Sequence, residues 1–160
     1  MNNEFSDETL GSPRLPESSL HLDGGAAKLL RWLLFITGCG LLTATLAIFL
    51  PAKMMASAHE WLGLGDFPEV PIVLYLARST SLLYAVHGSL MVYVSLDMNR
   101  YWPLVKLFGW LHIAIGLSML GIDISSSMPT YWVAIEGIPI AIAGCVIVGL
   151  WKKVESNSDN

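Results

Sequence analysis

Four long apolar stretches alternate with short polar segments along this chain. They cover residues 29–50, 72–96, 104–122 and 131–151, and a bilayer is crossed by a helix of roughly 20 apolar residues. Two of the connections between them are short, so consecutive helices are expected to run antiparallel and in contact. The pattern predicts an all-α membrane protein, a four-transmembrane-helix up-down bundle whose helical domain covers residues 26–152.

The segments outside these stretches have patterns of their own. Residues 1–25 are acidic and rich in Ser, Pro and Gly, and residues 153–160 are polar. Neither end has enough apolar surface to pack, so both are predicted to be disordered tails. Residues 52–64 are predicted to form a short external amphipathic helix on the membrane surface. Glycines and prolines then break this helix and direct the chain into the second stretch, namely Gly63, Gly65, Pro68 and Pro71.

The distribution of basic residues predicts the orientation in the membrane. Cytoplasmic loops carry an excess of Lys and Arg. One side of the predicted bundle holds almost all of them, whereas the opposite side holds only Lys53 and, at the edge of its helix, Arg78. The N- and C-termini are therefore both expected in the cytoplasm. The basic residues on that side are Arg14, Lys28, Arg31, Arg100, Lys106, Lys152 and Lys153.

Three ionisable residues are predicted near the external rim of the bundle. Arg78 and Glu136 lie about 9 Å and about 8 Å below the outer ends of their helices at 1.5 Å per residue, and Asp123 ends the third stretch at the same edge. Three interpretations are open: an ion pair that fixes helix register, separate snorkelling to the interface, or an outward-facing pocket for a small anion or cation. In the last case, His59 and Glu60 are candidates for the rim.

Two histidines lie at a similar depth in neighbouring stretches. His87 and His112 each lie roughly 12–13 Å from the inner edge, and a pair of imidazoles at one level is a known arrangement for holding haem. However, His87 follows Arg78 by nine residues, which places them on opposite faces of a helix at 100° per residue. If Arg78 points inward, His87 points to lipid or another protein, and His112 lies in the interior without an imidazole partner. Both His112 and His87 are predicted to be buried polar residues. No cofactor and no metal site is therefore expected.

Composition and charge exclude several function classes. The chain is 54% hydrophobic and only 14% charged, whereas soluble domains average about 25% charged residues. No basic patch suggests nucleic-acid binding, and the two cysteines, Cys39 and Cys145, form neither a disulfide framework nor a metal pattern. The segment His59–Glu60 lacks the second histidine of a zinc-protease helix, and no base accompanies the serines at 125–127. No catalytic residue is predicted.

Three segments carry a resemblance to a family. The segments "HEWLGLGDFPEVPIVLYLARS", "DMNRYWPL" and "MPTYWVAIEGIP" resemble those of uncharacterised small four-span bacterial inner-membrane proteins, over about residues 29–151. Such proteins have no assigned activity, so the resemblance implies a four-helix bundle in a bacterial inner membrane and no catalytic residue.

These observations lead to one main functional expectation and two alternatives. The main one is a non-enzymatic accessory or scaffold subunit, whose partners are the lipid bilayer and either further copies of itself or a larger membrane complex. The first alternative is a protein that binds or transports a small solute or ion through Arg78, Asp123 and Glu136. The second, more remote, is a haem-binding redox protein.

Overall fold

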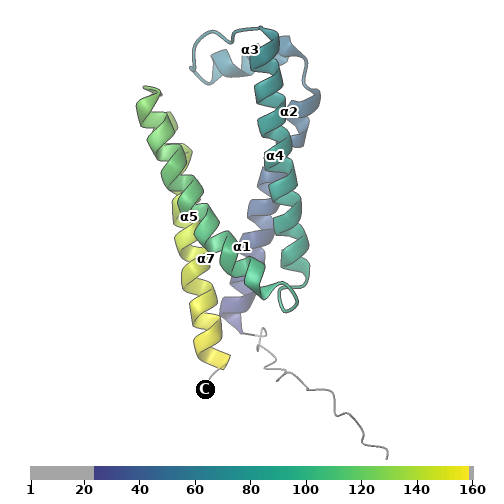
Figure 1. The fold of residues 1–160 in the computed structure, drawn as a ribbon, viewed down its shortest axis with the longest axis vertical. Coiled ribbons are helices and arrows are strands. Elements are labelled where there is room, and N and C mark those ends of the chain that lie inside the picture. Colours follow the sequence, from purple (N-terminus) through teal and green to yellow (C-terminus); the bar gives the residue numbers. More distant parts are fainter. Residues whose placement is uncertain (1–23, 159–160) are drawn as a thin grey trace, which may run out of the picture.

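The computed structural model describes residues 24–158, and every regular element within this range is a helix. The elements are α1 (Gly25–Leu42), α2 (Thr45–Phe49), α3 (Ala52–Trp61), α4 (Pro71–Leu96), α5 (Trp102–Ser125), α6 (Thr130–Ile135) and α7 (Gly137–Ser158) (Figure 1). The all-helical expectation is confirmed for these residues. The tail predicted at residues 1–25 lies almost wholly outside them. The C-terminal tail is a correction, because residues 153–158 continue α7 as helix.

Two of the long helices are interrupted by a local break. A turn at Thr43 and Ala44 separates α1 from α2, and the Thr43 hydroxyl donates to the Gly40 carbonyl over 2.7 Å. Glu136, with φ −98° and ψ −76°, separates α6 from α7. Pro139 explains this second break, because proline has no N–H to donate to the carbonyl of Ile135 four residues earlier.

The long helices pack as two pairs. Helix α1 packs along α4 and helix α5 packs along α7, while α4 and α5 meet at one end and diverge from there (Figure 1). The arrangement is therefore a wedge, in which α4 and α5 meet near their connection at residues 97–101. We call the joined end the core end, because buried side chains of all four long helices and of the connection between α4 and α5 meet there. They are Ala27, Leu30, Leu34, Met91, Val94, Met98, Trp102, Val105, Phe108, Ile147 and Val154.

Glycines allow the helix backbones to touch within each pair. A Cβ atom at Gly88 would lie 2.6 Å from the carbonyl oxygen of Gly38, so α4 and α1 meet with no side chain between them. A Cβ atom at Gly116 would lie 2.7 Å from the carbonyl oxygen of Gly137, which shows the same closeness between α5 and α7. Small residues at helix contacts are typical of membrane proteins. Each pair is therefore held by close backbone packing.

Three helical segments are long and apolar enough to cross a membrane. They are Gly25–Phe49, which joins α1 and α2, Trp102–Ser125, and Thr130–Ser158, which joins α6 and α7. Helix α4 has a comparable length of 26 residues but contains Arg78, His87 and several hydroxyl-bearing side chains. These residues lower its hydropathy, so by composition α4 does not meet the same criterion.

The end opposite the core is formed by α3 and the chain on either side of it. The helix predicted within residues 52–64 is present as α3, which lies across the tops of α2 and α4 (Figure 1). The Tyr131 hydroxyl at the start of α6 donates to the carbonyl of Leu62 just after α3. This hydrogen bond connects the two helix pairs at the end where their axes have diverged.

Candidate functional site

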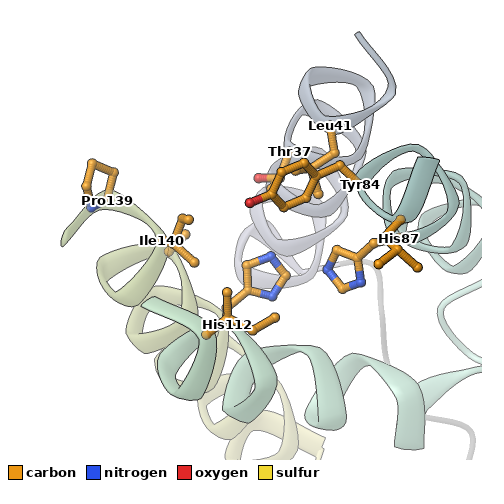
Figure 2. A pocket seen from close by; sticks show the side chains of 10 residues that line it. Thr37, Leu41, Tyr84, His87, His112, Pro139 and Ile140 are labelled. Atoms are coloured by element: carbon orange, nitrogen blue, oxygen red, sulfur yellow. The ribbon is translucent and has the colours of Figure 1, made fainter. Parts of the chain in front are cut away.

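A cavity of about 450 Å³ lies between the two helix pairs. All four long helices contribute to its wall, which is almost entirely apolar (Figure 2). Its polar groups come from two histidines, one tyrosine and one threonine. The lining residues are Thr37 and Leu41 from α1, Leu83, Tyr84 and His87 from α4, His112 and Ile115 from α5, and Pro139, Ile140 and Ala143 from α7.

His87 and His112 meet inside this cavity. Their ring centroids are 5.2 Å apart and the ring planes are inclined by 41°, and Figure 2 shows the two imidazoles side by side between α4 and α5. The expectation that His87 points to lipid is therefore wrong. The nine-residue spacing does place His87 and Arg78 on opposite faces of α4, but the interior face is that of His87.

The backbone of α5 fixes the ring of His112. Its Nδ1 lies 2.8 Å from the carbonyl oxygen of Phe108, one turn earlier, and only 4% of the residue is exposed. A carbonyl only accepts, so Nδ1 carries the proton in this bond and Nε2 keeps its lone pair. The burial predicted for His112 is confirmed, and the hydrogen bond explains how a polar ring is tolerated there.

The Nε2 atom of His87 has no such partner. It is buried and makes no hydrogen bond with the described residues. The ring itself is held in place by an edge-to-face contact with Phe108, at 5.4 Å between centroids. A buried polar atom without a hydrogen bond costs about 1–3 kcal/mol. Such atoms are rare in native structures, and each requires an explanation.

Arg78 takes a different role from the one predicted. Its guanidinium donates to the carbonyl oxygen of Leu50 over 3.2 Å, and the hydrogen bond is exposed. Leu50 is the C-cap of α2, where a carbonyl lacks a helical partner and the helix dipole favours a cation. Among residues 24–158 the one ion pair joins Lys106 to Glu155, so the expected Arg78–Glu136 pair is not formed. This corrects the hypothesis that the pair sets helix register.

The two acidic residues of the predicted pocket have different surroundings. Glu136 accepts a hydrogen bond from the indole Nε1 of Trp132. Asp123 is buried, with 3% of its surface exposed, and its Oδ2 has no partner among the described residues. Neither carboxylate lines the cavity. Arg78, Asp123 and Glu136 therefore do not form one site.

The predicted rim residues lie away from the cavity. The Nδ1 atom of His59 lies 2.9 Å from the carbonyl oxygen of Gly65 in the loop after α3. The His59 ring also packs edge-to-face on Phe67. Glu60 is exposed. Both residues lie in the last turn of α3. His59 therefore stabilises a loop rather than a binding site.

Tyr84 and Thr37 are cavity residues that the sequence did not single out. Tyr84 precedes His87 by three residues, so it lies on the same helix face. Thr37 precedes Leu41 by four residues and shares its face on α1. Tyr84 would have been found once the face of His87 was taken as the interior one of α4, whereas nothing on α4 points to Thr37.

The cavity offers few metal ligands. No group of three or more His, Cys, Asp or Glu side chains converges anywhere in residues 24–158. Cys39 and Cys145 are free thiols and neither lines the cavity. A protein-only metal site commonly uses three or four side-chain ligands. The cavity can therefore offer a ligand apolar contacts together with two imidazoles.

The core end carries a polar cluster at the helix termini. Glu155 near the end of α7 pairs with Lys106 and accepts from the indole Nε1 of Trp102 over 3.0 Å. The Lys106 ammonium also lies 5.0 Å from the ring centroid of Trp151. Lysines and tryptophans at this level are typical of a membrane–water interface. This cluster therefore favours a position at one surface of the bilayer.

Comparisons of the chain with protein-family models, with curated proteins and with solved structures found no match.

Proposed function

We propose that this is a multi-pass membrane protein that binds a largely apolar ligand in the cavity between its two helix pairs. The observation that carries the proposal is the His87–His112 pair inside an apolar wall. Ligand sites in proteins typically measure about 300–1,000 Å³, with an apolar lining and a few convergent polar groups. The cavity of about 450 Å³ has these features.

The topology proposed for the protein has four spans, namely the three apolar segments given above and, in addition, α4. Its 26 residues reach about 39 Å at 1.5 Å per residue, which exceeds the hydrocarbon thickness. The polar side of α4 is supported from within the protein, since His87 lies in the cavity and Arg78 caps α2. The basic residues favour cytoplasmic termini, and the resemblance favours a bacterial inner membrane.

Ligand binding is favoured over the scaffold interpretation. The scaffold hypothesis depended on an Arg78–Glu136 pair that set helix register, and Arg78 instead bonds to Leu50. A purely structural role gives no reason for an apolar cavity that contains two imidazoles. The proposed role is binding without catalysis, because within residues 24–158 no hydrogen bond joins the hydroxyl of Thr37 or Tyr84 to either imidazole of the cavity.

Native mass spectrometry of the protein extracted from its membrane tests this function. Ala143→Trp places an indole in the cavity from α7, and the matched control Ala114→Trp adds the same group on α5 at a position outside the cavity lining. We expect a bound mass on the wild-type chain, retained by Ala114→Trp and lost from Ala143→Trp. A second variant, Leu83→Trp, obstructs the cavity from α4. Because Leu83 is exposed, this substitution should leave the fold intact and provides the test if Ala143→Trp does not fold.

The proposal fails under two results. In the first, the wild-type chain carries no mass other than lipid and detergent. In the second, the folded Ala143→Trp and Leu83→Trp variants retain the bound mass as fully as Ala114→Trp does.

A further inference from the structure

We infer that the cavity binds an apolar alcohol, a neutral molecule with a hydroxyl head group on a hydrocarbon body, through Thr37, Tyr84 and His112. The inference rests on the proposed function and names the class of its ligand. The three residues come from three different helices, α1, α4 and α5, and each lines the cavity. Figure 2 shows the two hydroxyls and the ring of His112 pointing into the space between the helix pairs.

These three residues offer hydrogen-bonding atoms that the rest of the chain leaves free. Within residues 24–158 the hydroxyls of Thr37 and Tyr84 make no hydrogen bond. Because Nδ1 of His112 donates to the carbonyl of Phe108, its Nε2 can only accept a hydrogen bond. With four spans in a bilayer, little water is at hand to satisfy such atoms. A ligand that fills the cavity must therefore bring a polar group that meets them.

His87 lies beside this group and contributes to the wall instead. Its Nε2 is buried, so a ligand in the cavity does not reach that atom. Its ring packs edge-to-face on Phe108, at 5.4 Å between centroids, and lies 5.2 Å from the ring of His112. Recognition of the polar end of the ligand therefore depends on one imidazole and two hydroxyls.

The charge of the cavity lining favours a neutral ligand. The described residues that line it include no Lys, Arg, Asp or Glu. An ion placed in such a space would lose its hydration and gain no counterion, which is strongly unfavourable. This argument excludes fatty acids and alkylamines, which are charged at neutral pH.

A hydroxyl group matches the three free atoms in number and in kind. It has one O–H to donate and two lone pairs that accept. Its O–H would be donated to Nε2 of His112, and its lone pairs would accept from the hydroxyls of Thr37 and Tyr84. An ether, an ester or a ketone can accept from the two hydroxyls but cannot donate to the imidazole.

The remainder of the cavity suits a hydrocarbon body. Its wall on α7 is formed by Pro139, Ile140 and Ala143, which carry no polar side-chain atom. Helices α4 and α5 diverge from the core end (Figure 1), so a body longer than the cavity can extend between the helix pairs. Long-chain aliphatic alcohols and phenolic compounds such as quinols share this chemistry, and the experiment below distinguishes them.

Thermal unfolding of the full-length protein in micelles that contain a probe tests the inference. Dodecanol, its methyl ether, laurate and dodecylamine share one alkyl chain and differ in the head group, and para-nonylphenol presents a phenolic hydroxyl. We expect dodecanol or para-nonylphenol to raise Tm, because a ligand that binds only the folded chain stabilises it, and the dependence of Tm on the mole fraction of probe gives the affinity. The stronger of the two identifies the aliphatic or the phenolic class.

The other head groups and two variants locate the bound hydroxyl. The methyl ether, laurate and dodecylamine should bind at least about tenfold more weakly, because a site built for a hydroxyl rejects analogues without one. Tyr84→Phe and Thr37→Val each remove one cavity hydroxyl with little change of shape, so each should weaken binding of the hydroxyl probe about 2- to 10-fold. The controls Tyr75→Phe and Thr80→Val remove the same groups on α4 outside the cavity lining and should bind as the wild type does.

The outcomes are distinct from those of the proposed function. The inference is wrong if neither hydroxyl probe raises Tm, if the methyl ether or a charged probe binds as tightly as the hydroxyl probes, or if a double variant with Tyr84→Phe and Thr37→Val binds them as the wild type does. If native mass spectrometry then shows a bound mass that Ala143→Trp removes, the cavity remains a ligand site and only the assigned ligand class is wrong. If no mass is bound either, both proposals fail.

Discussion

A methyl group at Gly116 should force α5 and α7 apart. The added Cβ would lie closest to the backbone nitrogen of Ala141, and 2.7 Å from the carbonyl oxygen of Gly137. Both neighbours are backbone atoms, so no side chain can rotate out of the way. Ordinary contacts of a Cβ atom begin at 3.4 Å, so the two helices must separate locally by about 1 Å to accept Gly116→Ala.

The expected cost follows from what is known of overpacked interiors. Inserting a methyl group into a close-packed contact typically costs about 1–3 kcal/mol. The same substitution in open space on a helix gains about 0.5–1 kcal/mol, because alanine loses less backbone freedom than glycine on folding. Gly121, on the same helix, has no atom within 4 Å of the place that a Cβ would take, so Gly121→Ala is the matched control.

Thermal unfolding followed by circular dichroism in detergent measures the difference. For a chain of 160 residues, each 1 kcal/mol shifts Tm by about 2–4 °C. We expect Gly116→Ala to unfold at a lower temperature than the wild type and Gly121→Ala to unfold at the same or a slightly higher one. Equal melting temperatures for the two variants would refute the close packing of α5 on α7.

Three further predictions concern the polar groups of the protein. Asp123→Asn should raise the free energy of unfolding by about 1 kcal/mol, because a neutral amide of nearly the same shape costs less to bury than a carboxylate whose Oδ2 has no partner. A lower Tm would show that the carboxylate has a stabilising partner. Arg78→Gln should lower the free energy of unfolding by about 0.5–1.5 kcal/mol, because the hydrogen bond to the Leu50 carbonyl is lost. Arg78→Lys keeps a cationic donor and should lower it less, so equal losses for the two variants would count against that hydrogen bond. Glu155→Gln should lower the free energy of unfolding by at most about 1 kcal/mol, since the ion pair of Glu155 with Lys106 is partly exposed. The difference in Tm from the wild type should shrink as salt is added, and a difference that does not change with salt would exclude the ion pair as its cause.

The helices of this fold were predictable from the sequence, whereas their pairing was not. Runs of apolar residues long enough for a membrane helix are visible directly. The break at Glu136 follows from the chemistry of Pro139, although the apolar pattern indicates one continuous stretch over residues 131–151. In a membrane protein, however, lipid-facing and buried positions are both apolar, so the pattern contains little information about which side of a helix faces its neighbours. The wedge-shaped arrangement of the two helix pairs therefore depends on tertiary packing that the sequence pattern does not reveal.

The candidate site shows the same limit at the level of single residues. The spacing of Arg78 and His87 correctly gave opposite faces of α4, but it did not say which face is interior. Choosing the charged residue followed the usual rule that ionisable groups point inward. The rule failed because Arg78, near the end of its helix, reaches a carbonyl at the C-terminus of α2. Only the folded chain brings that acceptor within range.

The position of the wedge along the helices also determines how a ligand would reach it. His87 and His112 lie near the middle of α4 and α5, and Tyr131 and Leu62 connect the pairs at the α3 end. With four spans in a bilayer, the cavity would open sideways onto acyl chains rather than onto water. A molecule would then enter by lateral diffusion, and its occupancy would depend on its mole fraction among the lipids rather than on its aqueous concentration.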